Sequence, residues 1–361
     1  PTEVHRRTLL AKHRRVAELL CQLDAFPAGS YEVGQLETEL RGVVSALWGS
    51  DELRRAKPSP QKEARGGLAV VETSLWEAVP AFLRKLDATL ANHGGALPLD
   101  ASPVALASWM GGDRDGNPNV TAPVTRETVA AQRRMAAGLL LVELDALRTD
   151  LSMKQCTAAV TQLAEQSGAP SLDKLDAPYK AILDGLVGRL RATVAWADNE
   201  LSSDNALKDF PKESRNSLAS RFGRVAKADG VKGKAPLFDE SELLEPLQAM
   251  HASLCATGFE DWAEGRLVDT IRRVGAFGLQ LAPLDVRQES TRHANAIDAL
   301  RAYAGVGEPG SYIAMSDDEK VAYLSQELST NRPLLRRGQL EELVKGDFIP
   351  DAVDRDVLAT A

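Results

Sequence analysis

The segment from Ser108 to Pro118 carries the densest group of polar side chains in the sequence. Asp113, Arg114 and Asp115 follow one another, Asn117 comes two residues later, and three glycines lie among them. Glycine permits positive φ and close approach of a ligand, and a carboxylate beside an arginine can hold the guanidinium fork in one direction. The composition fits a ligand-binding loop, and it fits equally well a tight turn fastened by an Asp–Arg pair.

A calcium-binding loop is the first alternative to test, because Asp113, Asp115 and Asn117 occupy alternate positions. Such a loop needs glycine at its sixth position and glutamate at its twelfth. In this sequence Gly116 is the fourth residue of the pattern and Val124 is the twelfth. The pattern therefore does not predict a calcium site.

A second polar group, from Leu284 to His293, follows the best strand candidate in the chain, Leu279 to Arg287. Polar residues at the carboxyl end of a strand serve catalysis in α/β barrels, and the start of the following helix attracts anions. Arg287 is therefore a candidate phosphate ligand. An ordinary salt bridge from Arg287 to Asp285 or Glu289 is the alternative, and residue physics alone favours it.

Apolar residues recur at helical spacing along most of the chain, so the sequence predicts a mainly α protein with two or three short strands. The predicted helices span about 4–25, 31–57, 61–92, 125–151, 177–202, 241–257 and 259–275, followed by three shorter ones. We expect Pro80 to interrupt the third helix. The run Val104 to Met110 is a second strand candidate, although a helical turn would show the same pattern.

Residues 204–240 are rich in Asn, Ser, Gly, Pro and Lys, which is typical of a flexible connection. This connection is predicted to join a helical region at 1–203, which holds the loop at 108–118, to a second helical region at 241–361. We interpret the two regions as parts of one larger catalytic domain.

Composition restricts the partners. The net charge of −8 over 361 residues disfavours binding to nucleic acid, and no apolar run of membrane-spanning length occurs. We therefore expect a cytoplasmic protein with neither nucleic-acid nor membrane partners. The three cysteines, Cys21, Cys156 and Cys255, have no spacing that predicts a zinc site or a disulfide.

Three segments together resemble the phosphoenolpyruvate carboxylase family. Its loop Ser-Trp-Met-Gly-Gly-Asp-Arg-Asp-Gly-Asn-Pro matches Ser108–Pro118 without a change, and its segment Leu-Asp-Ile-Arg-Gln-Glu-Ser matches Leu284–Ser290 with Val286 in place of Ile. Pro1–Glu3 match the end of its Thr-Ala-His-Pro-Thr-Glu segment. The resemblance implies that the chain is the helical portion of a large (β/α)-barrel enzyme.

The family joins bicarbonate to phosphoenolpyruvate and releases phosphate, giving oxaloacetate that feeds the tricarboxylic acid cycle. The resemblance thus implies a carboxy-lyase that uses Mg²⁺ and works as an allosteric, cytoplasmic homotetramer. It also implies roles for single residues. Arg287 corresponds to a catalytic arginine near the phosphate, and Trp109 to the tryptophan of an apolar pocket near the carbon that is carboxylated. The wall of this substrate pocket would be shaped by Asp113, Arg114, Asp115 and Asn117, and a possible activator site would include Arg6 and Arg7.

The departures from the family pattern matter as well. The family's catalytic histidine would precede Pro1, and its metal ligands and mobile glycine-rich loop would follow Ala361. We therefore expect a truncated piece that is inactive alone and holds no metal ligand. The alternative is a non-catalytic helical regulatory or scaffold protein derived from this enzyme.

Overall fold

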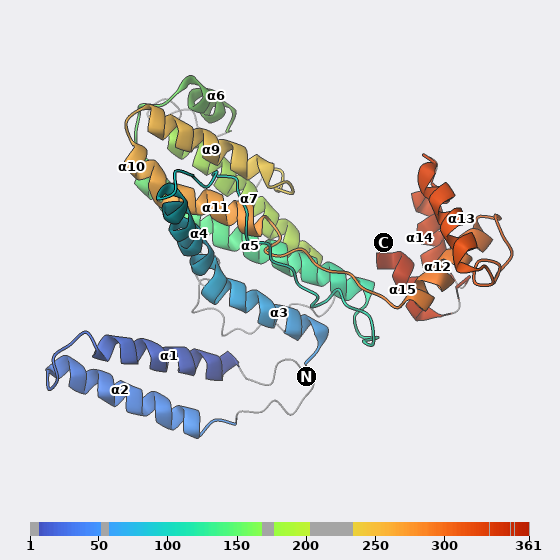
Figure 1. Ribbon diagram of the computed structural model, residues 1–361, viewed down its shortest axis with the longest axis horizontal. Coiled ribbons are helices and arrows are strands. Elements are labelled where there is room, and N and C mark those ends of the chain that lie inside the picture. Colours follow the sequence, from blue (N-terminus) through green and yellow to red (C-terminus); the bar gives the residue numbers. More distant parts are fainter. Residues whose placement is uncertain are drawn as a thin grey trace. The chain divides into compact units, whose positions relative to one another are not determined.

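The computed structural model describes residues 7–51, 58–167, 177–202 and 234–360, apart from Arg332, Asp347 and Pro350. The chain divides into two compact units, Pro1–Ser59 and Pro60–Ala361. In both units the regular structure is helical (Figure 1), which confirms the predicted mainly α class. No helix in the described ranges is long and apolar enough to cross a membrane.

The first unit is a hairpin of two helices, α1 (Arg7–Leu23) and α2 (Tyr31–Trp48) (Figure 1). Leu9 and Leu19 of α1 are buried, whereas Leu20 is exposed. The side chain of Ser30 caps α2 by accepting a hydrogen bond from a first-turn amide. The helix ends at Trp48, earlier than the predicted residue 57, because Gly49 caps it there.

The core of the second unit is formed mainly by five helices that pack against one another (Figure 1). They are α4 (Trp76–Ala91), α5 (Ala122–Asp150), α7 (Pro178–Ser202), α9 (Ser241–Ala256) and α11 (Val268–Phe277). Their facing sides bury a continuous set of aliphatic residues that includes Leu83, Leu140, Leu144, Leu147, Leu183, Leu247 and Ile271. Burial of this apolar area is the main term that stabilises the unit.

Helices from both sides of the predicted connection at 204–240 contribute to this one core. Most of that connection, 204–233, lies outside the described residues. Its flexibility, and the division of the chain at that point, stay predictions.

The predicted helix at 61–92 is irregular at a different place from the one expected. It consists of α3 (Pro60–Val70), a π-helical turn η1 (Val71–Leu75) and α4. Pro80 lies inside α4, so the predicted interruption at this proline is wrong. Pro80 has no N–H to donate to the carbonyl of Trp76, four residues earlier. That carbonyl instead accepts a hydrogen bond of 2.9 Å from Nε of Arg273.

Several shorter elements complete the unit. Helix α6 (Ala158–Gln166) was not predicted, and the predicted helix at 259–275 is split into α10 (Glu260–Trp262), the π-helical turn η4 (Ala263–Leu267) and α11. The chain then continues with four helices where three were predicted: α12 (Ser290–Tyr303), α13 (Asp317–Ser329), α14 (Arg337–Lys345) and α15 (Ala352–Thr360). Residues of α12, α14 and α15 share a second, small core.

The two strand candidates meet, but they do not form a regular sheet. They pair only in two isolated parallel bridges, Ser108 with Leu284 and Asp113 with Arg287. The expectation of a strand over Leu279–Arg287 therefore needs correction. Leu281 adopts a φ of 62° and Gly278 a φ of 54°, so the chain turns sharply before it becomes extended near Pro283.

Candidate functional site

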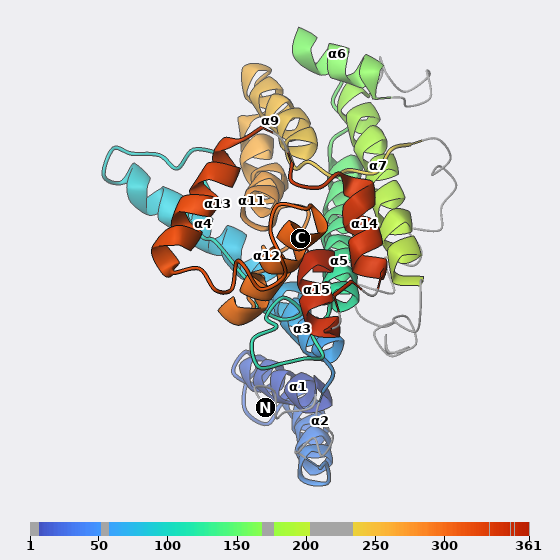
Figure 2. The same ribbon diagram turned by 90° about the vertical axis from the view of Figure 1, so that its right-hand side faces the viewer.

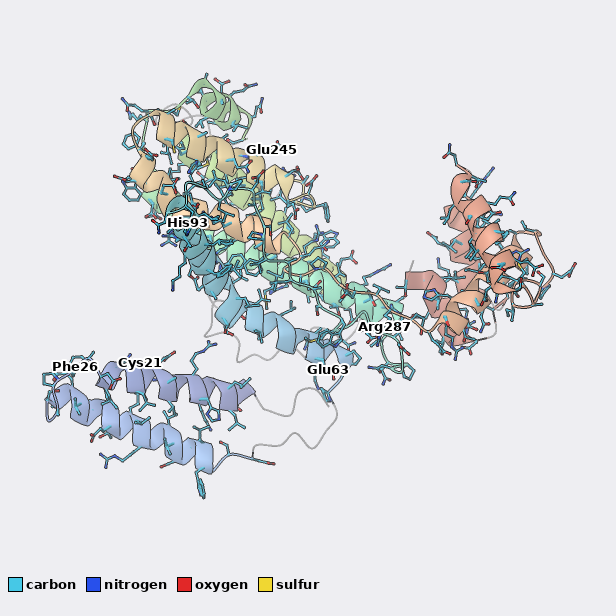
Figure 3. The ribbon with its side chains drawn as sticks, viewed as in Figure 1. Cys21, Phe26, Glu63, His93, Glu245 and Arg287 are labelled. Carbon is cyan, nitrogen blue, oxygen red and sulfur yellow. The ribbon has the colours of Figure 1, made fainter. Side chains whose placement is uncertain are left out.

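The two polar segments singled out in the sequence lie side by side at one end of the second unit. Four backbone hydrogen bonds join them: Ser108 N to Pro283 O (3.0 Å), Asp285 N to Ser108 O (2.8 Å), Arg287 N to Gly112 O (3.2 Å) and Arg114 N to Arg287 O (2.8 Å). Figure 3 shows Arg287 at this end of the helices, with His93 at a distance from it. We call the segments 108–118 and 283–289 the first and second site loops.

Two glycines make this close approach possible. A Cβ on Gly112 would lie 2.3 Å from the backbone oxygen of Asp285 and 2.9 Å from Cγ of Leu284. Gly111 has a φ of +86°, and its Cβ would lie 2.3 Å from the Oγ1 of Thr128 in α5. Only glycine fits at these two positions, so the glycine pair presses the first site loop against both the second loop and α5.

Arg287 forms a two-pronged ion pair with the first site loop. Its Nε donates to Oδ1 of Asp113 (3.0 Å) and its Nη2 donates to Oδ2 of the same carboxylate (2.8 Å). Asp115 lies 3.7 Å from the same Nη2. These hydrogen bonds lower the pKa of Asp113 below its ordinary value and raise the pKa of Arg287.

The pairing of Arg287 differs from the local salt bridge that residue physics favoured. Its partner is neither Asp285 nor Glu289 but Asp113, which lies 174 positions away. The side chain of Arg287 remains 64% exposed, and no acceptor among the described residues bonds to its Nη1. Arg287 is thus held in one direction while part of its guanidinium stays open to an anion.

Arg114 points the other way, into the protein. Its side chain is 2% exposed. All of its guanidinium nitrogens have partners: Gly112 O (3.0 Å), Thr125 Oγ1 (2.7 Å), Thr360 Oγ1 (2.8 Å) and Asp356 Oδ2 (3.1 Å). Arg114 therefore supports the first site loop from behind. Sequence analysis missed Asp356 and Thr360, since no local spacing connects residues more than 240 positions apart.

The other predicted residues of the first site loop lie at its surface. Trp109 is 57% exposed. Asn117 accepts a backbone hydrogen bond from Asn119 (3.2 Å), and Asp113 accepts one from Asp115 (3.2 Å), so short side chains brace the turn. The pocket that Trp109 and Arg287 are predicted to share stays a prediction.

The predicted activator pair belongs to the first unit. Arg6 lies outside the described residues, and of Arg7 only the backbone, at the start of α1, is described. This site stays a prediction. In the described ranges no group of three or more His, Cys, Asp or Glu side chains could hold a metal ion.

Comparisons with known proteins agree with the resemblance seen in the motifs. A family model described as phosphoenolpyruvate carboxylase matches residues 1–346. The phosphoenolpyruvate carboxylase of Pectobacterium carotovorum subsp. carotovorum is 42% identical over 338 residues, which cover 93% of this chain and 35% of the relative. That of Ectopseudomonas mendocina is 42% identical over 361 residues, covering 100% and 36%, and that of Escherichia coli is 39% identical over the same length.

The chain spans about a third of the length of these relatives. The match to the family model, in contrast, extends over nearly all of the chain and includes both site loops. On this basis the chain is a member of the phosphoenolpyruvate carboxylase family.

Proposed function

We propose that this chain is part of a phosphoenolpyruvate carboxylase, an enzyme that forms oxaloacetate and phosphate from phosphoenolpyruvate and bicarbonate. The observation that carries the proposal is the pairing of the two site loops, which holds Arg287 on Asp113 and leaves its outer edge open. The relatives that match this chain bear the name of this enzyme.

Arg287 is proposed to bind the phosphate region of phosphoenolpyruvate. Movement of a phosphoryl group needs cations fixed around its oxygens. The Asp113 carboxylate fixes the guanidinium before the substrate arrives, so that little reorganisation is needed on binding. Arginine suits this role because it can give several parallel N–H bonds to one phosphate.

Trp109 is proposed to form an apolar wall near the carbon that receives carbon dioxide. A carbanion-like intermediate is easily protonated by water, so the reaction benefits from a dry surface beside that carbon. The indole offers an apolar surface at the edge of the first site loop. Asp113, Asp115 and Asn117 are proposed to shape the loop around it.

The remaining features of the enzyme belong to the same proposal. We infer that the full enzyme uses Mg²⁺, assembles as a homotetramer and acts in the cytoplasm. Its product, oxaloacetate, would feed the tricarboxylic acid cycle. The described residues offer no cluster suited to a metal. As the resemblance implies, we expect the magnesium ligands in parts of the relatives' length that this chain does not span.

The test is replacement of Arg287 in a carboxylase that contains this chain together with the rest of the family's length. Arg287→Ala should lower kcat/KM for phosphoenolpyruvate by about 100- to 1,000-fold, the usual cost of removing one preorganised donor. Arg287→Lys should recover only part of it, because lysine lacks the two-pronged geometry.

Arg292→Ala is the matched control. Arg292 lies five positions further along and is also ion-paired, with Asp351 and Asp354. Its replacement should leave kcat/KM within a few-fold of the parent. Near-normal turnover in Arg287→Ala, or an equal loss in both variants, would remove the phosphate role of Arg287.

A further inference from the structure

We propose that Asp356, on α15, is a positioning residue that holds the first site loop, and through it Arg287, in the binding geometry. The inference rests on the proposed function for the role of Arg287. It adds a residue outside both site loops, in a helix that also contacts α12, α14 and α5.

Asp356 uses both of its carboxylate oxygens at the root of the first site loop. Oδ2 accepts a hydrogen bond from Nε of Arg114 (3.1 Å), and Oδ1 accepts one from the backbone N–H of Ala122 (2.6 Å), the first residue of α5. Thr121 stands at the cap position of α5 but makes no side-chain cap bond. Asp356 supplies that missing acceptor, and its negative charge suits the start of a helix.

The ion pair between Asp356 and Arg114 is largely removed from water, since their side chains are 16% and 2% exposed. Asp356 is the one carboxylate that pairs with Arg114 among the described residues. A buried guanidinium without a counter-charge is strongly unfavourable. Loss of the Asp356 charge should therefore force Arg114 to move toward water and carry the loop with it.

Movement of Arg114 would reach Arg287 through one backbone carbonyl. The oxygen of Gly112 accepts from Nη1 of Arg114 (3.0 Å) and from the backbone N–H of Arg287 (3.2 Å). The backbone N–H of Arg114 in turn donates to the oxygen of Arg287 (2.8 Å). Figures 1 and 2 both place α15 beside the beginning of α5, next to the first site loop.

Hydrogen exchange of this chain tests the positioning step without any need for activity. In Asp356→Asn the amide hydrogens of Arg114 and Arg287 should exchange at least about tenfold faster, because the bonds that join the two loops open more often. Asp351→Asn is the matched control: Asp351 precedes the same helix and pairs with Arg292, so both amides should exchange as in the parent.

Thr360→Val is a milder second variant, because it removes only one neutral partner of Arg114. It should accelerate the same two amides to a smaller degree, which keeps the test valid if Asp356→Asn unfolds. Unchanged exchange at both amides in the folded variants would overturn the proposal. So would equal acceleration in Asp351→Asn.

Kinetics of the longer enzyme separates positioning from general stability. Asp356→Asn should lower kcat/KM for phosphoenolpyruvate by about tenfold to a hundredfold, the range expected for a displaced binding group. In an Arg287→Ala background it should have almost no further effect, since both changes act on the same contact. Equal losses in the two backgrounds would show a role independent of Arg287 and overturn the proposal.

The two proposals can fail separately. A folded long enzyme that shows no carboxylation in its parent form would refute the proposed function. Faster exchange at Arg114 and Arg287 in Asp356→Asn would still establish that Asp356 holds the loops.

Discussion

The contact between the two site loops depends on the absence of a side chain at residue 112, and Gly112→Ala tests this directly. The added Cβ would lie 2.3 Å from the backbone oxygen of Asp285, whereas ordinary contacts begin at 3.4 Å. The oxygen belongs to the backbone and cannot rotate away. The loops must therefore separate by about 1 Å, with little relief from other adjustments.

The size of the effect follows from the bonds that such a separation breaks. The hydrogen bond from Arg287 N to Gly112 O is already 3.2 Å long, and the one from Arg114 N to Arg287 O is 2.8 Å long. Both would approach about 4 Å, which is too long for a hydrogen bond. Each loss costs about 1 kcal/mol, and overpacking adds about 1–2 kcal/mol, so we expect a total of about 3–4 kcal/mol.

Urea unfolding of the chain measures this change in the free energy of unfolding. Gly275→Ala is the control, because Gly275 lies in α11 with no heavy atom within 4 Å of its added Cβ. It should be neutral or stabilising by up to about 1 kcal/mol, as alanine favours the helix. If Gly112→Ala cost no more than Gly275→Ala, the tight contact between the loops would be wrong.

Two more predictions concern charged pairs. Arg287 lowers the pKa of Asp113 in the folded chain, so the ionised carboxylate increases the free energy of unfolding. This contribution is fully present above the pKa of Asp113 in the unfolded chain, about 3.9. It is lost as the pH falls through the lower pKa of Asp113 in the folded chain. The difference in unfolding free energy between the parent and Asp113→Asn should thus be constant above about pH 5 and shrink below it; a difference that grows on acidification would refute the pairing. The buried Glu143 forms an ion pair with the buried Arg273, with 3.1 Å between Oε2 and Nη1, so Glu143→Gln should cost about 3 kcal/mol in thermal or urea unfolding. Glu77→Gln removes a 77% exposed partner of the same arginine and should cost under about 1 kcal/mol; equal costs would contradict the dominance of the buried pair.

The long helices could be predicted from the sequence because their signal is local. The apolar spacing indicated a helix at 125–151, and α5 spans Ala122–Asp150. Leu140, Leu144 and Leu147, whose spacing of four and three places them on one face of this helix, are buried in the core. A periodic apolar face predicts both the helix and the side of it that packs into the core, so little other information is needed to predict either.

The irregular parts depended on residues that are distant in sequence. Pro80 is accommodated because Arg273 donates a hydrogen bond to the carbonyl that the proline leaves without its helical partner. No feature of the sequence near Pro80 predicts this contact with Arg273. The partner of Arg287 shows the same limit. Local spacing favoured Asp285 or Glu289, but the fold brings Asp113 closer. The family resemblance singled out both loops, while their hydrogen bonds to each other emerged only from the structure.

The alternation of charges in the first site loop explains how one short segment can serve both the interior and the surface. Asp113 pairs with Arg287 in a single bridge that lies between turns at 110–112 and 115–116. The side chain of Arg114 bonds inward to Asp356, while that of Asp113 bonds to Arg287 on the outside. The two arginines are chemically identical, yet one is 2% exposed and the other 64%.

This difference in burial supports the proposed roles of the two arginines. Every guanidinium nitrogen of Arg114 bonds to the protein, and the side chain is buried, so Arg114 is turned away from a substrate. Arg287 keeps an open edge, and its one close partner fixes its direction without enclosing it. Arg114 secures the loop from the inside, and the loop in turn orients Arg287 on the outside. Asp356 is the carboxylate that anchors Arg114, and Asp113 is the carboxylate that anchors Arg287.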